Sequence, residues 1–191
     1  MQNKAQLINA VIAHKGYTSY CELGLGVARE TYDNIICDYK MGIDDNPHTR
    51  PDFQGTTDAF FEKSSTGFDV FFIDAWHEDA QVVKDFDNCI YNLRLDGVIF
   101  MHDVGPALEK DTALTASGTA YKSFINIRNS SKYDAFCYQF PDGDVLGIVK
   151  LRENSNPLLI KRDIPITFEL YNSERETILQ KKTLEEVLSL V

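Results

Sequence analysis

Acidic and imidazole side chains follow two apolar runs of this 191-residue chain. The first run, FFID at residues 71–74, ends on Asp74, and His77 comes three residues later. The second, VIFMHD at residues 98–103, ends on His102 and Asp103. A carboxylate next to a buried strand is costly unless it is paired or bound to a metal. The four residues are therefore candidates for one catalytic or metal-binding cluster.

These residue types can activate a hydroxyl group. A hard cation held by two carboxylates can bind two adjacent substrate oxygens and lower the pKa of one of them. A nearby imidazole can then remove the proton at neutral pH. Asp74 and His77 lie in one loop, so both can face the same substrate.

A second set of candidates follows two earlier apolar segments. ELGLG at residues 22–26 contains glycines, which let the backbone pass close to a ligand. Asp44 ends the next segment, where a carboxylate can accept hydrogen bonds from ribose hydroxyls. The alternatives are an ordinary strand-to-helix turn at the glycines and a turn or cap aspartate in IDDNP.

Apolar periodicity predicts the elements that would position these groups. Helical spacing indicates helices at residues 4–15, 27–34, 56–65, 78–93 and 121–128. Continuous apolar runs, typical of strands buried on both faces of a parallel sheet, lie within residues 17–24, 38–43, 68–74 and 95–103. A hairpin around PDGD closes this part of the chain. The alternation predicts an α/β fold, an open twisted and mostly parallel sheet with helices on both faces.

Details of the helices and of the tail are also predicted. Thr56 or Thr57 is the expected cap of the third helix. In the helix at 78–93 the apolar stripe holds Val82, Val83, Phe86, Ile90 and Leu93, with Asp85 and Asp87 on the solvated face. We divide the chain into a domain at residues 1–150 and an appended segment at 151–191. That segment is expected to contain a strand in PITFELYN and capping boxes at Ser173–Glu176 and Thr183–Glu186, and to cover the core or pair with another subunit.

Composition excludes several classes of partner. The chain has 19 basic and 29 acidic residues, a formal net charge of -10, and 43% hydrophobic residues, enough for one domain with a core. This charge repels nucleic acid and anionic membranes, and no basic cluster stands out. The four cysteines lack metal-ligand spacing, and no run approaches the roughly 20 apolar residues that span a bilayer. We expect a reduced, cytoplasmic protein that binds neither nucleic acid nor membrane.

The order and spacing of several segments between residues 18 and 150 resemble class I S-adenosylmethionine-dependent methyltransferases. These segments are CELGLG, GIDDNP, TTDAFF, FDVFFIDAWHEDAQVVKDFDNCIYNLRLDGVIFMHDVGP and AYKSFINIR. The resemblance is greatest to the group that includes metal-dependent macrolide-sugar O-methyltransferases, and residues 68–106 are its most specific part. The chain departs from the family where Val27 and Ala28 replace the usual third glycine of the loop.

The resemblance implies a Rossmann-like fold and an enzyme that uses S-adenosylmethionine and a divalent cation, Mg²⁺ by default. Asp74 and Asp103 would be ligands of the cation, with His102 as a third, and Asp74 would also border the cofactor. His77 would be the general base. The implied cofactor contacts are Glu22, Gly24 and Gly26 around the methionine portion, Asp44 on the ribose, and Thr57 and Asp58 near the adenine.

Other interpretations stay open at this point. Asp74, Asp103 and His77 could make helix or loop caps, and His102 could face the core. A metal-dependent hydrolase would use the same Asp and His residues and would not need the glycine loop, so a bulky residue at Gly24 would leave its activity intact. A non-catalytic assembly module of the same fold would act through the tail. The acceptor is expected to be a small hydroxylated molecule such as a sugar, and a homo-oligomer is compatible with a chain of this size.

Overall fold

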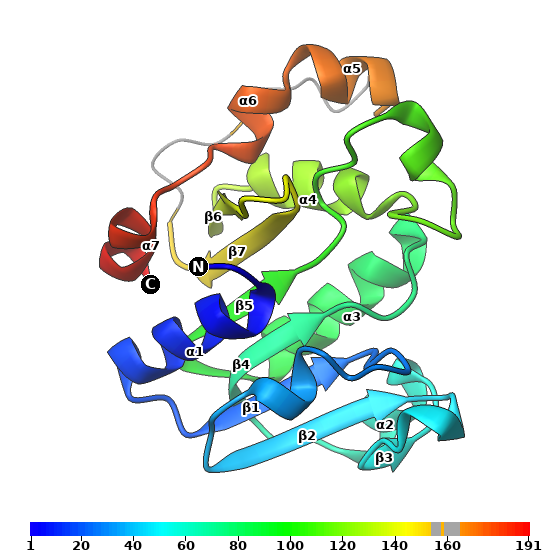
Figure 1. The fold of residues 1–191 in the computed structure, drawn as a ribbon, viewed down its shortest axis with the longest axis vertical. Coiled ribbons are helices and arrows are strands. Elements are labelled where there is room, and N and C mark those ends of the chain that lie inside the picture. The colour runs from blue at the N-terminus through cyan, green and yellow to red at the C-terminus, as the bar shows by residue number, and fades with distance from the viewer. Residues whose placement is uncertain (154–157, 159–164) are drawn as a thin grey trace.

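A seven-stranded sheet in the order β3-β2-β1-β4-β5-β7-β6 forms the centre of the computed structural model, which describes residues 1–153, 158 and 165–191 (Figure 1). Neighbouring strands from β3 to β5 run parallel, and β7 pairs antiparallel with both β5 and β6. The strands are β1 Ser19–Leu23, β2 Tyr39–Asp44, β3 Phe53–Gln54, β4 Phe68–Ile73, β5 Leu93–Met101, β6 Tyr133–Gln139 and β7 Val145–Leu151. The predicted parallel sheet with a closing hairpin is confirmed.

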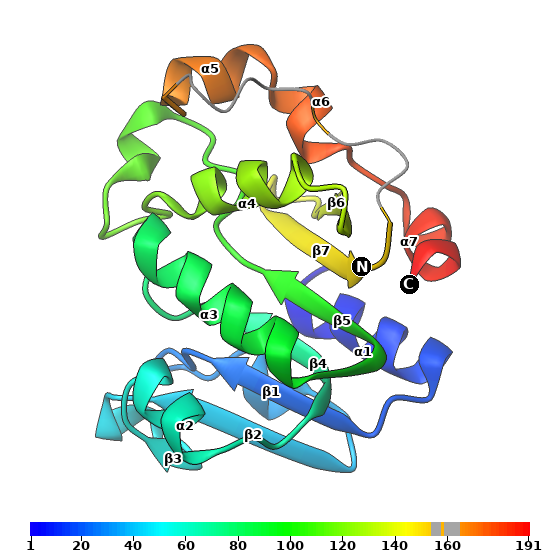
Figure 2. The same cartoon turned by 180° about the vertical axis from the view of Figure 1, so that it is seen from behind.

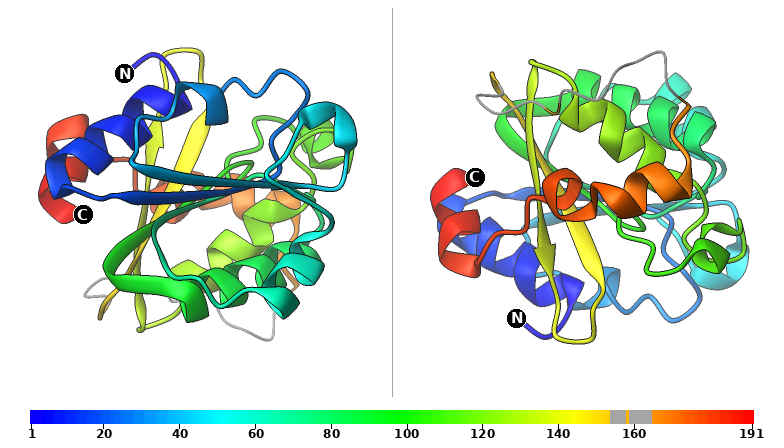
Figure 3. Two further views of the ribbon diagram at one scale, coloured as in Figure 1. Left: turned by 90° about the horizontal axis from the view of Figure 1, so that it is seen from below. Right: turned by 90° about the horizontal axis from the view of Figure 1, so that it is seen from above.

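Helices cover both faces of this sheet. Helices α2, α3 and α4 lie over one face (Figure 2), while α1 and α7 lie over the other (Figure 3). The helices are α1 Lys4–Lys15, α2 Thr57–Lys63, α3 Asp79–Asn92, α4 Ala120–Arg128, α5 Phe168–Ser173, α6 Arg175–Leu179 and α7 Leu184–Leu190, with short 3-10 turns η1 Tyr32–Asn34, η2 Pro47–Thr49 and η3 Glu109–Thr112.

The alternation of side chains along β4 divides the core into two halves. Phe71 and Ile73 pack with the helices α3 and α4, whereas Val70 and Phe72 pack on the side of α1. All four are buried, as a central parallel strand requires. The sheet is therefore held rigidly from both faces, and the loops at its carboxyl end are built on a fixed base.

The predicted helix at residues 27–34 is wrong except for the η1 turn. Arg29 has φ of 51° and so occupies the left-handed region, which a right-handed helix does not tolerate. Its guanidinium instead donates to the carbonyl of Thr49 at 2.7 Å and pairs with Asp33 at 2.8 Å. The segment after the glycines is thus an irregular loop tied to η2.

Two predictions for the tail are also wrong. PITFELYN forms no strand, because the Thr167 side chain accepts the Leu170 amide at 3.2 Å and starts helix α5. Ser173 lies inside α5, and Glu174 stands at the N-cap of α6. The Thr183–Glu186 capping box is confirmed by reciprocal contacts of 2.8 and 3.3 Å.

The tail contributes to the core where it is described. Tyr171, Ile178 and Leu179 are fully buried in the half of the core under α3 and α4, and Val187 is buried against the side of α1. The tail therefore covers the core, one of the two roles expected for it. Pairing with a second subunit stays a prediction, as does the boundary at residue 150. Residues 154–157 and 159–164 lie outside the described part.

The cap expected for helix α2 is confirmed. Thr56 caps α2 by accepting the Ala59 amide at 3.2 Å. Cys21, Cys89 and Cys137 are buried free thiols. No helix in residues 1–153 and 165–191 is both long and apolar enough to cross a membrane.

Helix α3 differs at two positions from the predicted pattern of buried and exposed side chains. Val83 is exposed, whereas Asp85 is completely buried, and its Oδ2 has no hydrogen-bond partner. Its Oδ1 accepts from Gln81 at 3.1 Å. Burial raises the pKa of Asp85 from 3.8 to about 6. Asp87 is exposed, as expected.

Asp85 should make stability depend on pH. Because its pKa is raised on folding, the folded state holds the proton more tightly than the unfolded chain, so its stabilising contribution falls as pH rises from about 4 to 6. We expect Asp85→Asn to gain stability over the wild type across this interval, by on the order of 2 to 3 kcal/mol. Urea unfolding at pH 4, 5, 6 and 7 measures this, with the exposed Asp87→Asn as control. Equal pH profiles for the three proteins would contradict it.

Candidate active site

The carboxyl ends of β1, β4 and β5 meet side by side. The Asp74 amide donates to the Leu23 carbonyl at 2.8 Å, and the His102 amide donates to the Ile73 carbonyl at 3.0 Å. Each strand therefore extends its ladder by one residue into the loop that follows. This alignment brings the glycine loop, Asp74 and the His102–Asp103 pair to one edge of the sheet.

Gly24 permits the closest approach between two of these loops. It has φ of 83°, and a Cβ on it would lie 2.2 Å from the Asp74 carbonyl oxygen. Gly26 also has positive φ, at 59°, but a Cβ there would meet nothing within 4 Å. Gly24 is thus required by its neighbour, whereas Gly26 is required only by its own backbone.

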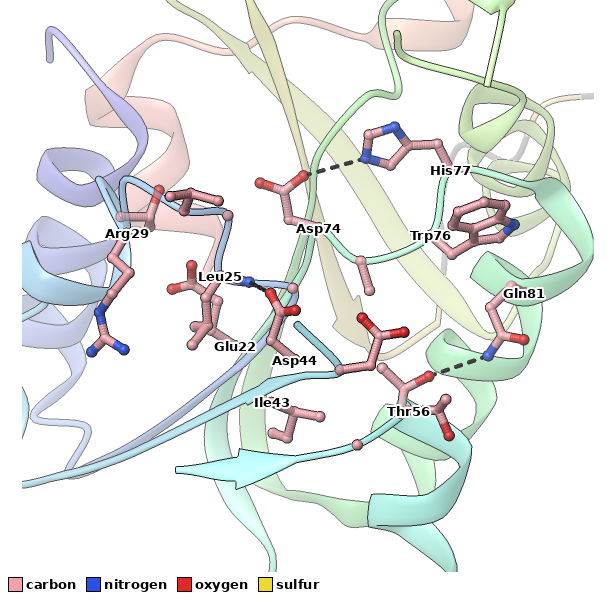
Figure 4. Close-up of a pocket in the computed structure, with 18 of the residues that line it drawn as sticks. Glu22, Leu25, Arg29, Ile43, Asp44, Thr56, Asp74, Trp76, His77 and Gln81 are labelled. Atoms are coloured by element: carbon pink, nitrogen blue, oxygen red, sulfur yellow. Dashed lines mark hydrogen bonds and ion pairs between the residues drawn. The ribbon is translucent and has the colours of Figure 1, made fainter. Parts of the chain in front are cut away.

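A cavity of about 710 Å³ opens between the glycine loop, β2, α2 and the loop after β4 (Figure 4). All the predicted cofactor residues line it: Glu22, Gly24, Gly26, Asp44, Thr57, Asp58 and Asp74. The lining contains six carboxylates and two cationic side chains, Lys4 and Arg29. The cavity is therefore acidic and is suited to a ligand that carries positive charge.

Asp44 holds the glycine loop in place from the neighbouring strand. Its Oδ2 accepts the Leu25 amide at 2.8 Å, a contact that Figure 4 marks, and its Oδ1 accepts the Asn46 amide at 2.9 Å. Each carboxylate oxygen still has a lone pair for a ligand hydroxyl. The expected binding aspartate also proves to be a turn aspartate, so the two interpretations of IDDNP are compatible.

Helix α3 contributes Gln81, a residue that the sequence did not single out. Its side-chain amide donates to Thr57 Oγ1 at 3.2 Å and to Asp58 Oδ1 at 3.1 Å, which ties α3 to the start of α2. All three residues line the cavity. A glutamine among acids on a helix gives no signal by itself.

Glu22 lines the cavity and is only 2% exposed. Burial raises its pKa to about 8, although the Tyr20 hydroxyl donates a hydrogen bond to it. Its carboxyl group can therefore stay protonated near neutral pH. A cationic ligand in the cavity would instead favour the ionised form.

Asp74, His102 and Asp103 converge at the second part of the site. Each offers one ligand atom, and these atoms lie within 4.8 Å of one another. His102 Nδ1 is 2.9 Å from Asp74 Oδ1 and 3.2 Å from Asp103 Oδ2. Asp103 has φ of 58°, a strained conformation for a residue with a side chain. The predicted metal ligands are thus brought together.

Charge compensation inside this cluster shifts its titrations. Burial alone would lower the pKa of His102, but the surrounding carboxylates hold it well above its usual value. Burial alone would raise the pKa of Asp103, yet the contacts with His102 lower it. The imidazole of His102 and the surrounding carboxylates therefore compensate each other's charge.

His77 points toward the same cluster. Its Nε2 lies 3.2 Å from Asp103 Oδ2 and 3.9 Å from Asp74 Oδ1, and Figure 4 shows it facing Asp74. Its Nδ1 lies 2.6 Å from the Ala116 carbonyl, which can only accept, so Nδ1 carries a proton. The Thr119 amide donates to the His77 carbonyl at 2.8 Å. The loop after β5 thereby fixes both the orientation of His77 and the position of its proton.

Two further residues reach His102 from distant parts of the chain. Asp144, in the turn between β6 and β7, places Oδ2 3.2 Å from His102 Nε2. Lys4, at the start of α1, places Nζ 3.1 Å from the same nitrogen. The sequence marked PDGD only as a turn, and the antiparallel pairing of β7 with β5 is what brings Asp144 here.

The interpretation of Asp74 as a helix cap is not supported. Glu78 occupies the N-cap of α3, and Thr119 Oγ1 accepts the first helical amide, that of Asp79, at 2.8 Å. Asp74 instead contacts His102. His14 and His48 are exposed and lie outside this cluster.

Comparison with known proteins shows what this chain is similar to. Residues 25–104 match the family model described as a methyltransferase domain. Over this segment the chain is similar to methyltransferase domains. The matched segment runs from the glycine loop through β4 and β5 to the residue after Asp103. No curated protein matches the chain in sequence.

Solved structures of methyltransferases share the fold of this domain. An SAH-bound methyltransferase of Podospora anserina, PaMTH1, aligns with TM-score 0.59 and 13% identity over 80% of each chain. The O-methyltransferase TomG of Streptomyces achromogenes, in complex with SAM, aligns with TM-score 0.57 and 12% identity over 78% of this chain and 79% of TomG. An O-methyltransferase of Bacillus cereus in complex with SAH gives 0.56 and 13%, over 78% and 80%. The resemblance to class I methyltransferases is confirmed, whereas the narrower macrolide-sugar group stays a prediction.

Gly24 and Gly26 offer a matched test of the close approach. Both have positive φ, so alanine at either costs about 1 to 2 kcal/mol in backbone conformation. Only Gly24→Ala also drives a Cβ into the Asp74 carbonyl, and we expect it to lose at least about 2 kcal/mol more than Gly26→Ala. Urea unfolding of the two variants measures the difference. Equal losses would show that the two loops are not in contact.

Proposed function

We propose that the protein is an S-adenosylmethionine-dependent O-methyltransferase that uses a divalent cation and methylates a hydroxyl group of a small molecule. The observation that carries this proposal is the position of Asp74, which lines the acidic cavity and also contacts the cluster of His102 and Asp103. A cofactor in the cavity and a hydroxyl at the cluster would therefore meet at one carboxylate.

The charge of the cavity supports this cofactor. S-adenosylmethionine carries an ammonium, a sulfonium and a carboxylate, so its net charge is positive, and when bound it supplies an electrophilic methyl group. Glu22, Gly24 and Gly26 would surround its methionine portion, and Asp44 would accept hydrogen bonds from its ribose hydroxyls. Thr57 and Asp58, at the start of α2, would lie near its adenine. Solved structures of the same fold with SAM or SAH bound support this choice of cofactor.

The donor set of the cluster fits a divalent cation. Asp74 and Asp103 offer two carboxylates, and His102 offers a nitrogen at comparable distances. A cation held there would bind the acceptor oxygen and lower the pKa of its hydroxyl. Mg²⁺ is the default expected from the resemblance.

His77 would take the proton from the acceptor hydroxyl. Its Nδ1 is directed at the Ala116 carbonyl and its Nε2 at Asp74 and Asp103. With a cation on these two carboxylates, Nε2 would be left to accept the proton of the hydroxyl. With the cofactor bound, the hydroxyl oxygen would form a bond to its methyl carbon as the bond from that carbon to sulfur breaks. The products would be a methyl ether and S-adenosylhomocysteine, with the proton held on His77.

The loop after β5 and the exposed Trp76 border the space left for the acceptor. Trp76 is 57% exposed, and residues 104–119 reach the site through Ala116 and Thr119. A sugar or glycosylated metabolite is the expected acceptor. A cytoplasmic location, the absence of nucleic-acid and membrane partners, and the oligomeric state stay predictions.

Cofactor binding can be measured by calorimetry without knowing the acceptor. We expect S-adenosylmethionine to bind with and without Mg²⁺, and Asp44→Asn to weaken it about tenfold through the lost charged acceptor. The matched control is Asp38→Asn, which removes an exposed carboxylate just before β2, at the opposite end of the strand from Asp44. Absence of binding by the wild-type protein in both conditions would refute the proposal.

The role of His77 separates binding from chemistry. We expect His77→Gln to bind S-adenosylmethionine with unchanged affinity and to lower the rate of methyl transfer by about 10²- to 10⁴-fold. Transfer of a radiolabelled methyl group to a panel of catechols and glycosides measures the rate, with the exposed His48→Gln as control. A fully active His77→Gln would leave His77 with a purely structural role.

A further inference from the structure

His102 is oriented by carboxylates on both sides of its ring. Nδ1 faces Asp74 at 2.9 Å and Asp103 at 3.2 Å, while Nε2 faces Asp144 Oδ2 at 3.2 Å. The ring stands edge-on to Phe72, with centroids 6.4 Å apart. Asp144 is itself held, because its Oδ1 accepts the Val145 amide at 2.8 Å. The imidazole is thus fixed with one nitrogen toward the candidate cation site and the other toward an outer acid.

This arrangement matches the usual surroundings of a metal-bound histidine. Such a histidine donates its other ring N–H to a carboxylate, which fixes the tautomer and makes the ligating nitrogen more basic. Imidazole nitrogen suits Zn²⁺, Fe²⁺ and similar ions, whereas Mg²⁺ prefers oxygen ligands and retained waters. The donor set therefore fits a transition metal better than it fits Mg²⁺.

The distances within the cluster are compatible with a shared ion. Two ligands at right angles on a metal with bonds of about 2.1 Å stand about 3 Å apart. His102 Nδ1 lies at 2.9 and 3.2 Å from the two carboxylate oxygens. The three atoms can thus occupy neighbouring positions on one ion with little movement.

We propose that this centre selects a divalent first-row transition metal over Mg²⁺, with His102 Nδ1 as a ligand and Asp144 as its positioning residue. The proposal rests on the divalent-cation part of the proposed function and replaces its default metal. It is independent of the identity of the acceptor.

Lys4 competes with Asp144 for the Nε2 atom of His102. Its Nζ lies 3.1 Å from His102 Nε2, and a nitrogen cannot accept from Lys4 while it donates to Asp144. Only the tautomer that donates to Asp144 leaves the Nδ1 lone pair for a metal. The carboxylate of Asp144 is what favours this tautomer, so its charge should matter for metal affinity.

The experiment uses untagged, metal-free full-length protein titrated with Co²⁺ and with Mg²⁺. We expect Co²⁺ to bind at least tenfold more tightly by calorimetry and to give the visible absorption bands of a nitrogen-ligated ion. His102→Glu, which makes the donor set all-oxygen, should reduce the ratio of Co²⁺ to Mg²⁺ affinity about tenfold and change the Co²⁺ spectrum. His48→Glu, at an exposed position, should change neither.

A second pair of variants tests Asp144. We expect Asp144→Asn to weaken Co²⁺ binding by about 10- to 100-fold. Asp142→Asn removes the same charge from the same turn and keeps the oxygen that accepts the Asp144 amide, so it should bind Co²⁺ like the wild type. Equal losses in the two variants would assign the effect to the turn or to net charge and would overturn the positioning role.

The outcomes also separate this proposal from the proposed function. Equal affinity for Mg²⁺ and Co²⁺, an unchanged ratio in His102→Glu, or no metal binding would overturn the transition-metal proposal. S-adenosylmethionine binding measured on the same metal-free sample tests the methyltransferase independently. Metal selectivity without cofactor binding would instead keep the metal centre and refute the proposed function.

Discussion

The contact between the ends of β1 and β4 is the constraint on which the site depends. The Asp74 amide bonds to Leu23, and Gly24 leaves room for the Asp74 carbonyl where any Cβ would collide. This contact fixes how far the glycine loop stands from the acid that follows β4. Because the parallel sheet beneath is buried on both faces, the contact is not free to open. The distance between the cavity and the His–Asp cluster is therefore set by backbone.

The site concentrates acidic side chains, which repel one another where they are ionised. Six carboxylates line the cavity, and Asp103 adds a strained backbone beside it. Glu22 is buried with its pKa raised to about 8. Cationic occupants would relieve this repulsion, so cofactor and metal should each stabilise the fold by mass action. His102 and Lys4 stand among these acids and compensate part of their charge.

Apolar periodicity predicted the helices and strands whose side chains are buried at regular intervals, because apolar residues recur in the sequence wherever the element faces the core. The sheet and the helices α1, α3 and α4 follow from apolar spacing. The rule that ligand residues follow the carboxyl ends of parallel strands predicts Asp74 and Asp103 at one edge of the sheet, where the structure has them. The predictions fail where a single local contact determines the conformation of the backbone. Arg29 in the left-handed region breaks a helix, and the Thr167 cap starts one where a strand was expected. Asp144 was missed because only the pairing of β5 with β7 brings it to His102.

The structure also changes how a hydrolase would be distinguished from a methyltransferase. A hydrolase needs the metal cluster and no glycine loop, so a bulky residue at Gly24 was expected to spare it. Gly24 lies directly against the Asp74 backbone, however, and such a residue would displace a metal ligand under either hypothesis. Gly26 has open space around it and lines the same cavity, so a larger side chain there would fill the cofactor site and leave Asp74 in place. Loss of activity in that variant, with metal binding retained, separates the two chemistries because only the methyltransferase needs the cavity.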